Sequence, residues 1–187
     1  IAVSQAIGYT AQFGSNTKGI QIGFAARAGL EAAVLAESGA TGNLDIIENH
    51  NGFFALLGQL DKNRINLIEN NIGKKWSLLE HGLYLKPWPS CGYTHRAITA
   101  ALTIRQELKN QIDHISEVSV VMPDFHYRIL PFTIPQNHNE ALFSLPACLA
   151  KILFDGSLTL RDYENSFWAH SKIQQLIRKI IIKTEPV

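Results

Sequence analysis

Small and apolar residues recur with helical spacing over residues 20–38, and this pattern predicts one long α-helix. The helix carries many glycines and alanines on one face, which lets other helices approach closely, so we expect a buried, central position. Before it we expect the tail of another helix at residues 1–12 and a loop at residues 13–19. After it, residues 44–57 predict a short helix followed by an apolar one, and the polar run at 61–76 predicts exposed surface.

From residue 76 onward, extended and helical segments alternate. Apolar residues recur at helical spacing from Thr94, a candidate N-cap, and residues 115–123 alternate apolar and polar positions as a half-buried strand does. The remaining segments are predicted to be extended at 81–89, helical at 139–154 with a kink at Pro146, a capped short helix at 159–164 and a strand at 180–187.

This order of elements predicts a mainly α chain with an α+β part, in which a segment of an all-helical domain is followed by a smaller α+β domain. We assign residues 1–75 to the helical domain, 76–136 to the α+β part, 137–170 to helices of a crossover region and 171–187 to the return to the sheet. The chain opens inside a helical pattern and closes on a strand with no partner after it, so we expect more chain on both sides.

Composition predicts a globular protein. Hydrophobic residues make up 46% of the 187 positions, and a net charge of +1 without a basic face gives no reason to expect a nucleic-acid partner. Two cysteines, Cys91 and Cys148, are too few for a disulfide framework, and no signal peptide is present, so we expect a cytoplasmic location. Arg27 and Glu31 interrupt the alanine-rich helix, which we expect to fall short of a membrane span.

The segment KPWPSCGYTHRAITAAL, residues 86–102, joins a proline-bracketed loop to an apolar helix. Two prolines stiffen the segment that carries Lys86, and the unpaired N–H groups of the helix start are expected near Lys86, Cys91 and His95. Such a junction suits an anionic ligand. Equally, Lys86 could be a solvated surface lysine and His95 a helix-start residue bonded to backbone. The histidines show no HxxxH or HExxH spacing, so we expect no zinc site.

Four motifs along the chain resemble, in the same order, those of the MmgE/PrpD family: FGSNTKGIQIGFAARAGLEAAVLAESGATG, NGFFALL, LKPWPSCGYTHRAITAAL and NEALFSLPACLAKILFDG. The resemblance spans nearly the whole chain. It implies a large helical domain and a smaller α+β lid with the active site between them, a homodimer, and members considerably longer than this chain. Known members include 2-methylcitrate dehydratase, which belongs to propionate catabolism, cis-aconitate decarboxylase and iminodisuccinate epimerase.

The resemblance also implies roles for individual residues. Lys18 and Lys86 match two lysines that line the family's active site, and His95 matches a histidine commonly found in a THRA or THPA sequence. Cys91 stands where decarboxylase-like members have a histidine, and Gln21 stands where a further histidine is often found. Ser144 lies in a motif near the family's site. We therefore expect Lys18, Lys86 and His95 to be catalytic, and Lys18, Gln21, Lys86, Cys91 and Ser144 to bind substrate.

The implied substrates are small di- or tricarboxylates whose reactions begin with loss of a proton or of carbon dioxide next to a carboxylate. Lysines would stabilise the negative charge that develops, a contribution of about 2.7–4 kcal/mol per donor, and no metal or organic cofactor is needed. We expect a 2-methylcitrate dehydratase-like lyase whose catalysis requires further segments. The alternatives are a non-catalytic module for carboxylate binding or dimerisation, which the residues at 91 and 21 favour, and an epimerase of an amino-linked dicarboxylate.

Overall fold

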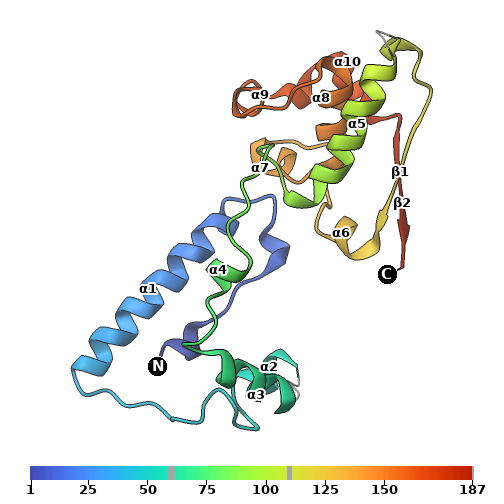
Figure 1. Cartoon of the computed structure of the whole chain (residues 1–187). Coiled ribbons are helices and arrows are strands. Elements are labelled where there is room, and N and C mark those ends of the chain that lie inside the picture. The colour runs from blue at the N-terminus through green and yellow to red at the C-terminus, as the bar shows by residue number, and fades with distance from the viewer. Residues whose placement is uncertain (59–61, 109–110, 187) are drawn as a thin grey trace. The chain divides into compact units, whose positions relative to one another are not determined.

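A computed structural model describes residues 1–58, 62–108 and 111–186 (Figure 1). The described chain is mainly helical and contains one two-stranded parallel sheet, which confirms the predicted class of a mainly α chain with an α+β part. Its contacts group into two compact units. The first unit comprises residues 1–9 and 19–85, and the second comprises residues 10–18 and 86 onward. The four-part domain assignment made above stays a prediction.

The first unit contains one long helix and several short helical segments. Its elements are the 3₁₀ turn η1 (Ala2–Gln5) and the helices α1 (Thr17–Glu37, nearly all in this unit), α2 (Phe53–Leu57), α3 (Lys62–Asn71) and α4 (Ser77–Glu80). The prediction of a helix tail over residues 1–12 was wrong, because only 3₁₀ turns form there. The side-chain amide of Gln21 holds the backbone of Tyr9, with a Tyr9 N to Gln21 Oε1 distance of 2.6 Å, and keeps this segment out of a helix.

Helix α1 confirms the predicted long helix but not its predicted burial. Only Ala28 and Ala32 are buried, whereas large apolar side chains such as Ile22, 74% exposed, face solvent. The described residues of the first unit place few apolar side chains against it. By length and composition alone, α1 could cross a membrane, so the expectation that it falls short of a membrane span was wrong by that criterion. The core helices of soluble proteins and signal sequences meet the same criterion.

The second unit combines helices with the sheet. Its elements are η2 (Thr10–Gln12), η3 (Gly92–Thr94), α5 (His95–Leu108), η4 (Ile112–His114), β1 (Val118–Pro123), α6 (Asp124–Arg128), α7 (His138–Ala141), α8 (Leu145–Asp155), α9 (Leu160–Glu164), η5 (Phe167–Ala169), α10 (Ser171–Ile177) and β2 (Ile180–Glu185). Strands β1 and β2 pair in parallel with Val118 opposite Ile180, as the predicted strands at 115–123 and 180–187 require (Figure 1).

Helix α8 forms the centre of the second unit. Nine of its eleven residues are buried, and it packs against α5 and α10 (Figure 1). It begins at Leu145 because the Ser144 hydroxyl accepts a hydrogen bond from Ala147 N, and it ends at Gly156, whose φ of 84° suits a left-handed C-cap. Pro146 therefore lies in the first turn, where proline is well tolerated, and the predicted kink there was wrong.

Two sequence predictions about helix ends had different outcomes. The capped helix at 159–164 is confirmed, since Thr159 and Asp162 form a capping box at the start of α9. The prediction of Thr94 as an N-cap was wrong. Its hydroxyl donates to the carbonyl oxygen of Cys91 at 2.8 Å and pairs with the Ser90 hydroxyl at 2.7 Å, so it closes the 3₁₀ turn η3 instead.

Candidate functional site

A pocket of about 730 Å³ lies within the second unit. Its walls are largely apolar, with aromatic side chains from Phe13, Trp88, Tyr93 and Phe143. Its polar lining residues are Lys18, Lys86, Ser90, His138 and Thr159, and Cys91 is also at the surface of the pocket. None of the lining residues, all of which lie in the described part of the chain, is acidic. A pocket of this size and composition suits a small anionic molecule.

Lys18, the second residue of α1, lines this pocket from the first turn of the helix. The rings of Phe13 and Phe143 stack with centroids 5.0 Å apart, and Lys18 Nζ lies 5.6 Å from the first centroid and 5.4 Å from the second. Attraction between the ammonium and the ring faces holds the charge near the pocket wall without neutralising it. Lys18 therefore keeps a positive charge available for a ligand.

Two close contacts fix the loop before α1 on the second unit. Gly14 has a φ of 85°, and a Cβ atom at this position would lie 2.2 Å from Cε2 of Phe132, so only glycine fits. Asn139 Nδ2 donates to Asn16 Oδ1 at 2.6 Å, which ties the loop to α7 although the two residues are 123 positions apart.

The proline-bracketed segment places Lys86 in the same pocket. Lys86 Nζ donates to the carbonyl oxygen of Ser90 at 3.1 Å, and the side chain remains among the pocket-lining residues. The backbone N–H of Cys91 donates to the carbonyl oxygen of Leu142 at 2.9 Å, which fastens the segment to the end of α7. The structure thus brings Lys18, Lys86 and Cys91, three of the residues selected from the sequence, to one pocket.

His95 is placed differently. It is only 5% exposed, its ring lies edge-on to that of Trp88 with centroids 5.4 Å apart, and it does not line the pocket, whereas Trp88 does. Burial lowers the pKa of His95, hydrogen bonding with the Ser90 backbone opposes this effect, and the nearby charge of Lys86 adds to it. His95 is therefore a neutral group behind the Trp88 wall at neutral pH.

Gln21 and Ser144 also have structural partners. The Gln21 amide bonds both backbone groups of Tyr9 in the first unit, and the residue does not line the pocket. Ser144 is fully buried, and its hydroxyl donates to the carbonyl oxygen of Thr133 at 3.0 Å while it caps α8. Neither residue lines this pocket, and the substrate contacts expected from the sequence stay predictions.

Sequence reasoning missed His138, which we treated as one of several structural histidines. It is the first residue of α7, a helix capped by Asn137, whose Oδ1 accepts from Glu140 N at 3.0 Å. The Asn137–Glu140 spacing is a recognisable helix-start signal that could have located His138 at a helix start. Among the described residues, no three His, Cys, Asp or Glu side chains gather as a metal ion would require.

The chain matches two family models. The model of the MmgE/PrpD N-terminal domain matches residues 1–66, and that of the MmgE/PrpD C-terminal domain matches residues 88–187. Among curated proteins, the chain is 29% identical over 192 residues to the cis-aconitate decarboxylase of Mus musculus and 27% identical over 191 residues to that of Homo sapiens. Each match covers 100% of this chain but only 38% and 39% of the respective relative.

Proposed function

The chain belongs to the MmgE/PrpD family, and on this premise we propose that it supplies the cationic part of the site of a lyase or isomerase that acts on a small di- or tricarboxylate. The observation that carries the proposal is the position of Lys18 and Lys86 in one pocket without an acidic lining residue. Two ammonium groups in one apolar-walled pocket favour a ligand with two or more carboxylates, because each carboxylate can pair with one positive charge.

The proposed chemistry is charge stabilisation next to a carboxylate. When a C–H or C–CO₂ bond breaks at that carbon, the electron pair spreads into the carboxylate and doubles its negative charge. Lys18 and Lys86 would lower the energy of this intermediate, because they are already in place before the charge develops. We propose dehydration of a 2-methylcitrate-like substrate as the overall reaction.

Decarboxylation of cis-aconitate is the second candidate, and its support is the similarity to two cis-aconitate decarboxylases. Cys91 argues against it, since the resemblance described above implies a histidine at this place in decarboxylase-like members. Turnover of both acids by the full-length protein, with products identified by NMR, separates the two candidates. Formation of carbon dioxide supports decarboxylation, and loss of water supports dehydration. We also propose a homodimer, which light scattering would test.

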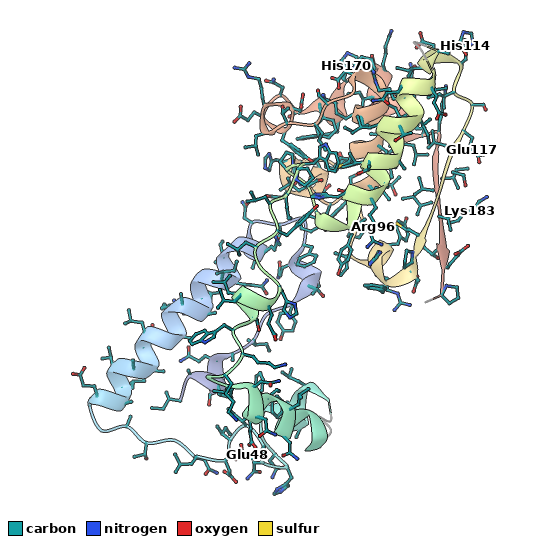
Figure 2. All side chains as sticks on the ribbon, viewed as in Figure 1. Glu48, Arg96, His114, Glu117, His170 and Lys183 are labelled. Carbon is teal, nitrogen blue, oxygen red and sulfur yellow. The ribbon has the colours of Figure 1, made fainter. Side chains whose placement is uncertain are left out.

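The lysine pocket itself is tested by binding. We expect Lys18→Met and Lys86→Met each to weaken the binding of tricarballylate, a tricarboxylate without a hydroxyl leaving group, by about 10- to 100-fold in calorimetry. Lys183→Met is the matched control, because Lys183 lies exposed on β2 (Figure 2) and does not line the pocket. This substitution therefore removes the same charge at a site away from the ligand. Unchanged affinity in both pocket variants, or an equal loss in the control, would contradict the proposed function.

A further inference from the structure

Helix α7 and the residue after it are hydrogen-bonded to both lysine-bearing segments. At its second residue, Asn139 Nδ2 donates to Asn16 Oδ1, two positions before Lys18, at 2.6 Å. Just after its end, the carbonyl oxygen of Leu142 accepts from the backbone of Cys91, in the segment that carries Lys86, at 2.9 Å. This short helix is thus tied to the chain segments from which both lysines extend.

His138 is the first residue of that helix and lines the lysine pocket. Its ring lies 5.6 Å from that of Tyr163, centroid to centroid, in an edge-on arrangement. Tyr163 is 1% exposed and is itself packed edge-on against Phe167 at 5.2 Å, so it gives the imidazole a rigid backing. Burial raises the pKa of Tyr163, which keeps this backing surface uncharged. The imidazole is thus supported on one side and reaches the pocket.

We infer that the imidazole of His138, and not that of His95, takes the proton from, or gives it to, the substrate carbon next to the carboxylate. Among the described residues, His138 is the one histidine that lines the pocket with Lys18 and Lys86, whereas His95 lies behind Trp88. Imidazole is the side chain best suited to accept and return a proton near neutral pH. The inference rests on the proposed function, because it requires a carboxylate bound between the lysines.

The proton balance is complete for either candidate reaction. In dehydration, the C–H bond breaks, the proton moves to the imidazole, and the electron pair enters the carboxylate held by the lysines. The C–O bond then breaks, and the departing hydroxide takes the proton from the imidazolium as water, which restores neutral His138. In decarboxylation, the C–CO₂ bond breaks, carbon dioxide leaves, and the electron pair enters the remaining carboxylate held by the lysines. The imidazolium form of His138 then gives its proton to the carbon, and a proton taken up from the solvent restores the imidazolium.

The charged and titratable groups around His138 favour this role. Lys18 and Lys86 line the same pocket, the Cys91 thiol faces it, and the Tyr163 ring backs the imidazole. The nearest acid along the helix, Glu140, has its carboxylate bonded to Gln136 N at 2.8 Å and to Asn137 Nδ2 at 2.9 Å. Glu140 is therefore occupied at the helix start, which leaves His138 as the proton acceptor that α7 brings to the pocket.

The test compares His138→Gln with the wild type in the full-length protein. Glutamine keeps a polar side chain but cannot carry the proton, so we expect incorporation of deuterium from D₂O next to the carboxylate, and turnover, to fall by about 100-fold or more. Tricarballylate affinity should change less than about threefold, because the lysines remain. His170→Gln is the control, since His170 precedes α10 and lies outside the pocket (Figure 2).

Each outcome decides the inference. Wild-type binding of tricarballylate with loss of exchange only in His138→Gln supports it. Exchange that persists in His138→Gln, or that is lost equally in His170→Gln, overturns it while the lysine pocket stands. Loss of exchange in His95→Gln or Cys91→Ser with exchange retained in His138→Gln assigns the proton to another group and also overturns it. A wild type that does not bind tricarballylate contradicts the proposed function itself, and the inference with it.

Discussion

Helices α8 and α1 are both rich in apolar residues, yet they have opposite environments. In α8, in the second unit, nine of eleven residues are buried, whereas in α1, almost wholly in the first unit, two of twenty-one are. Helix α8 is surrounded by α5 and α10, and the described residues provide no comparable cover for α1. Apolar composition therefore shows that a helix can be buried, while the elements that pack on it decide whether it is.

The pocket also belongs to the better-packed of the two units. Every residue that lines it belongs to the second unit, and each lysine segment is hydrogen-bonded to α7 or to the residue after it. Phe13, Trp88 and Phe143, which line the pocket, also pack against or belong to the hydrophobic core of this unit. The aromatic walls of the pocket thus depend on a well-packed interior, and substitutions in that interior should affect the stability of the chain most.

The largest effect should come from removing buried atoms. We expect Ile152→Ala, at a fully buried position of α8, to lower the free energy of unfolding of the second unit by about 4 kcal/mol, because it leaves a cavity in a close-packed core. Ile22→Ala, at a position of α1 that is 74% exposed, should change the free energy of unfolding of the first unit by less than about 0.5 kcal/mol. Urea unfolding followed by tryptophan fluorescence measures both. Equal losses would mean that α1 is covered in solution.

Helices α8 and α1 also differ in the burial of their charged side chains. Lys151 in α8 is 4% exposed and pairs with Asp155 at 2.6 Å and with Asp162 at 2.9 Å, whereas the Arg27–Glu31 pair on α1 is exposed. We expect Lys151→Met to cost about 2 kcal/mol of unfolding free energy, since two partly exposed carboxylates lose their charged hydrogen-bond donor. Arg27→Met should cost less than about 0.5 kcal/mol. Urea denaturation at pH 7 measures the difference.

Acid unfolding gives this prediction a second readout. Burial raises the pKa of Asp162, but the hydrogen bonds and charge of Lys151 and the hydrogen bonds of Thr159 outweigh it and hold the pKa below its usual value. This stabilisation is present above about pH 4 and is lost as the pH falls through the lowered pKa. We expect Lys151→Met to lose less stability than the wild type between pH 4 and pH 2. Parallel curves would show that Lys151 does not stabilise the charged form.

Local patterns predicted the elements that depend on neighbouring residues. The capping box of α9, the helix after Thr94 and the two strands all follow from spacing within a few positions. The prediction failed where distant contacts decide: Gln21 holds Tyr9 out of a helix, and α1 lacks the expected cover. In the site, the local junction at residues 86–102 predicted Lys86, but no local pattern predicted His138. The hydrogen bond that brings its helix to the segment before Lys18 joins Asn139 and Asn16, which are 123 positions apart.

The smallest expected effect on stability comes from substitutions at two glycines that have similar positive φ angles. Gly14 in the second unit and Gly39 in the first have φ values of 85° and 93°, so alanine at either position should cost about 1 kcal/mol. Nothing lies within 4 Å of a Cβ at Gly39, whereas at Gly14 the Cβ would overlap the Phe132 ring and push the loop outward. We therefore expect Gly14→Ala to cost about 1 kcal/mol more than Gly39→Ala in urea unfolding.

Only the Gly14 substitution should also affect binding, because its loop leads directly into the first turn of α1, which holds Lys18 over the Phe13 and Phe143 rings. A displaced loop moves one ammonium group away from the pocket, so tricarballylate should bind about tenfold more weakly to Gly14→Ala and unchanged to Gly39→Ala, as calorimetry would measure. If both variants bind alike, the loop does not set the position of Lys18. In that case the charge of the pocket depends on Lys86 and its proline-bracketed segment, and Lys18→Met should leave affinity unchanged as well.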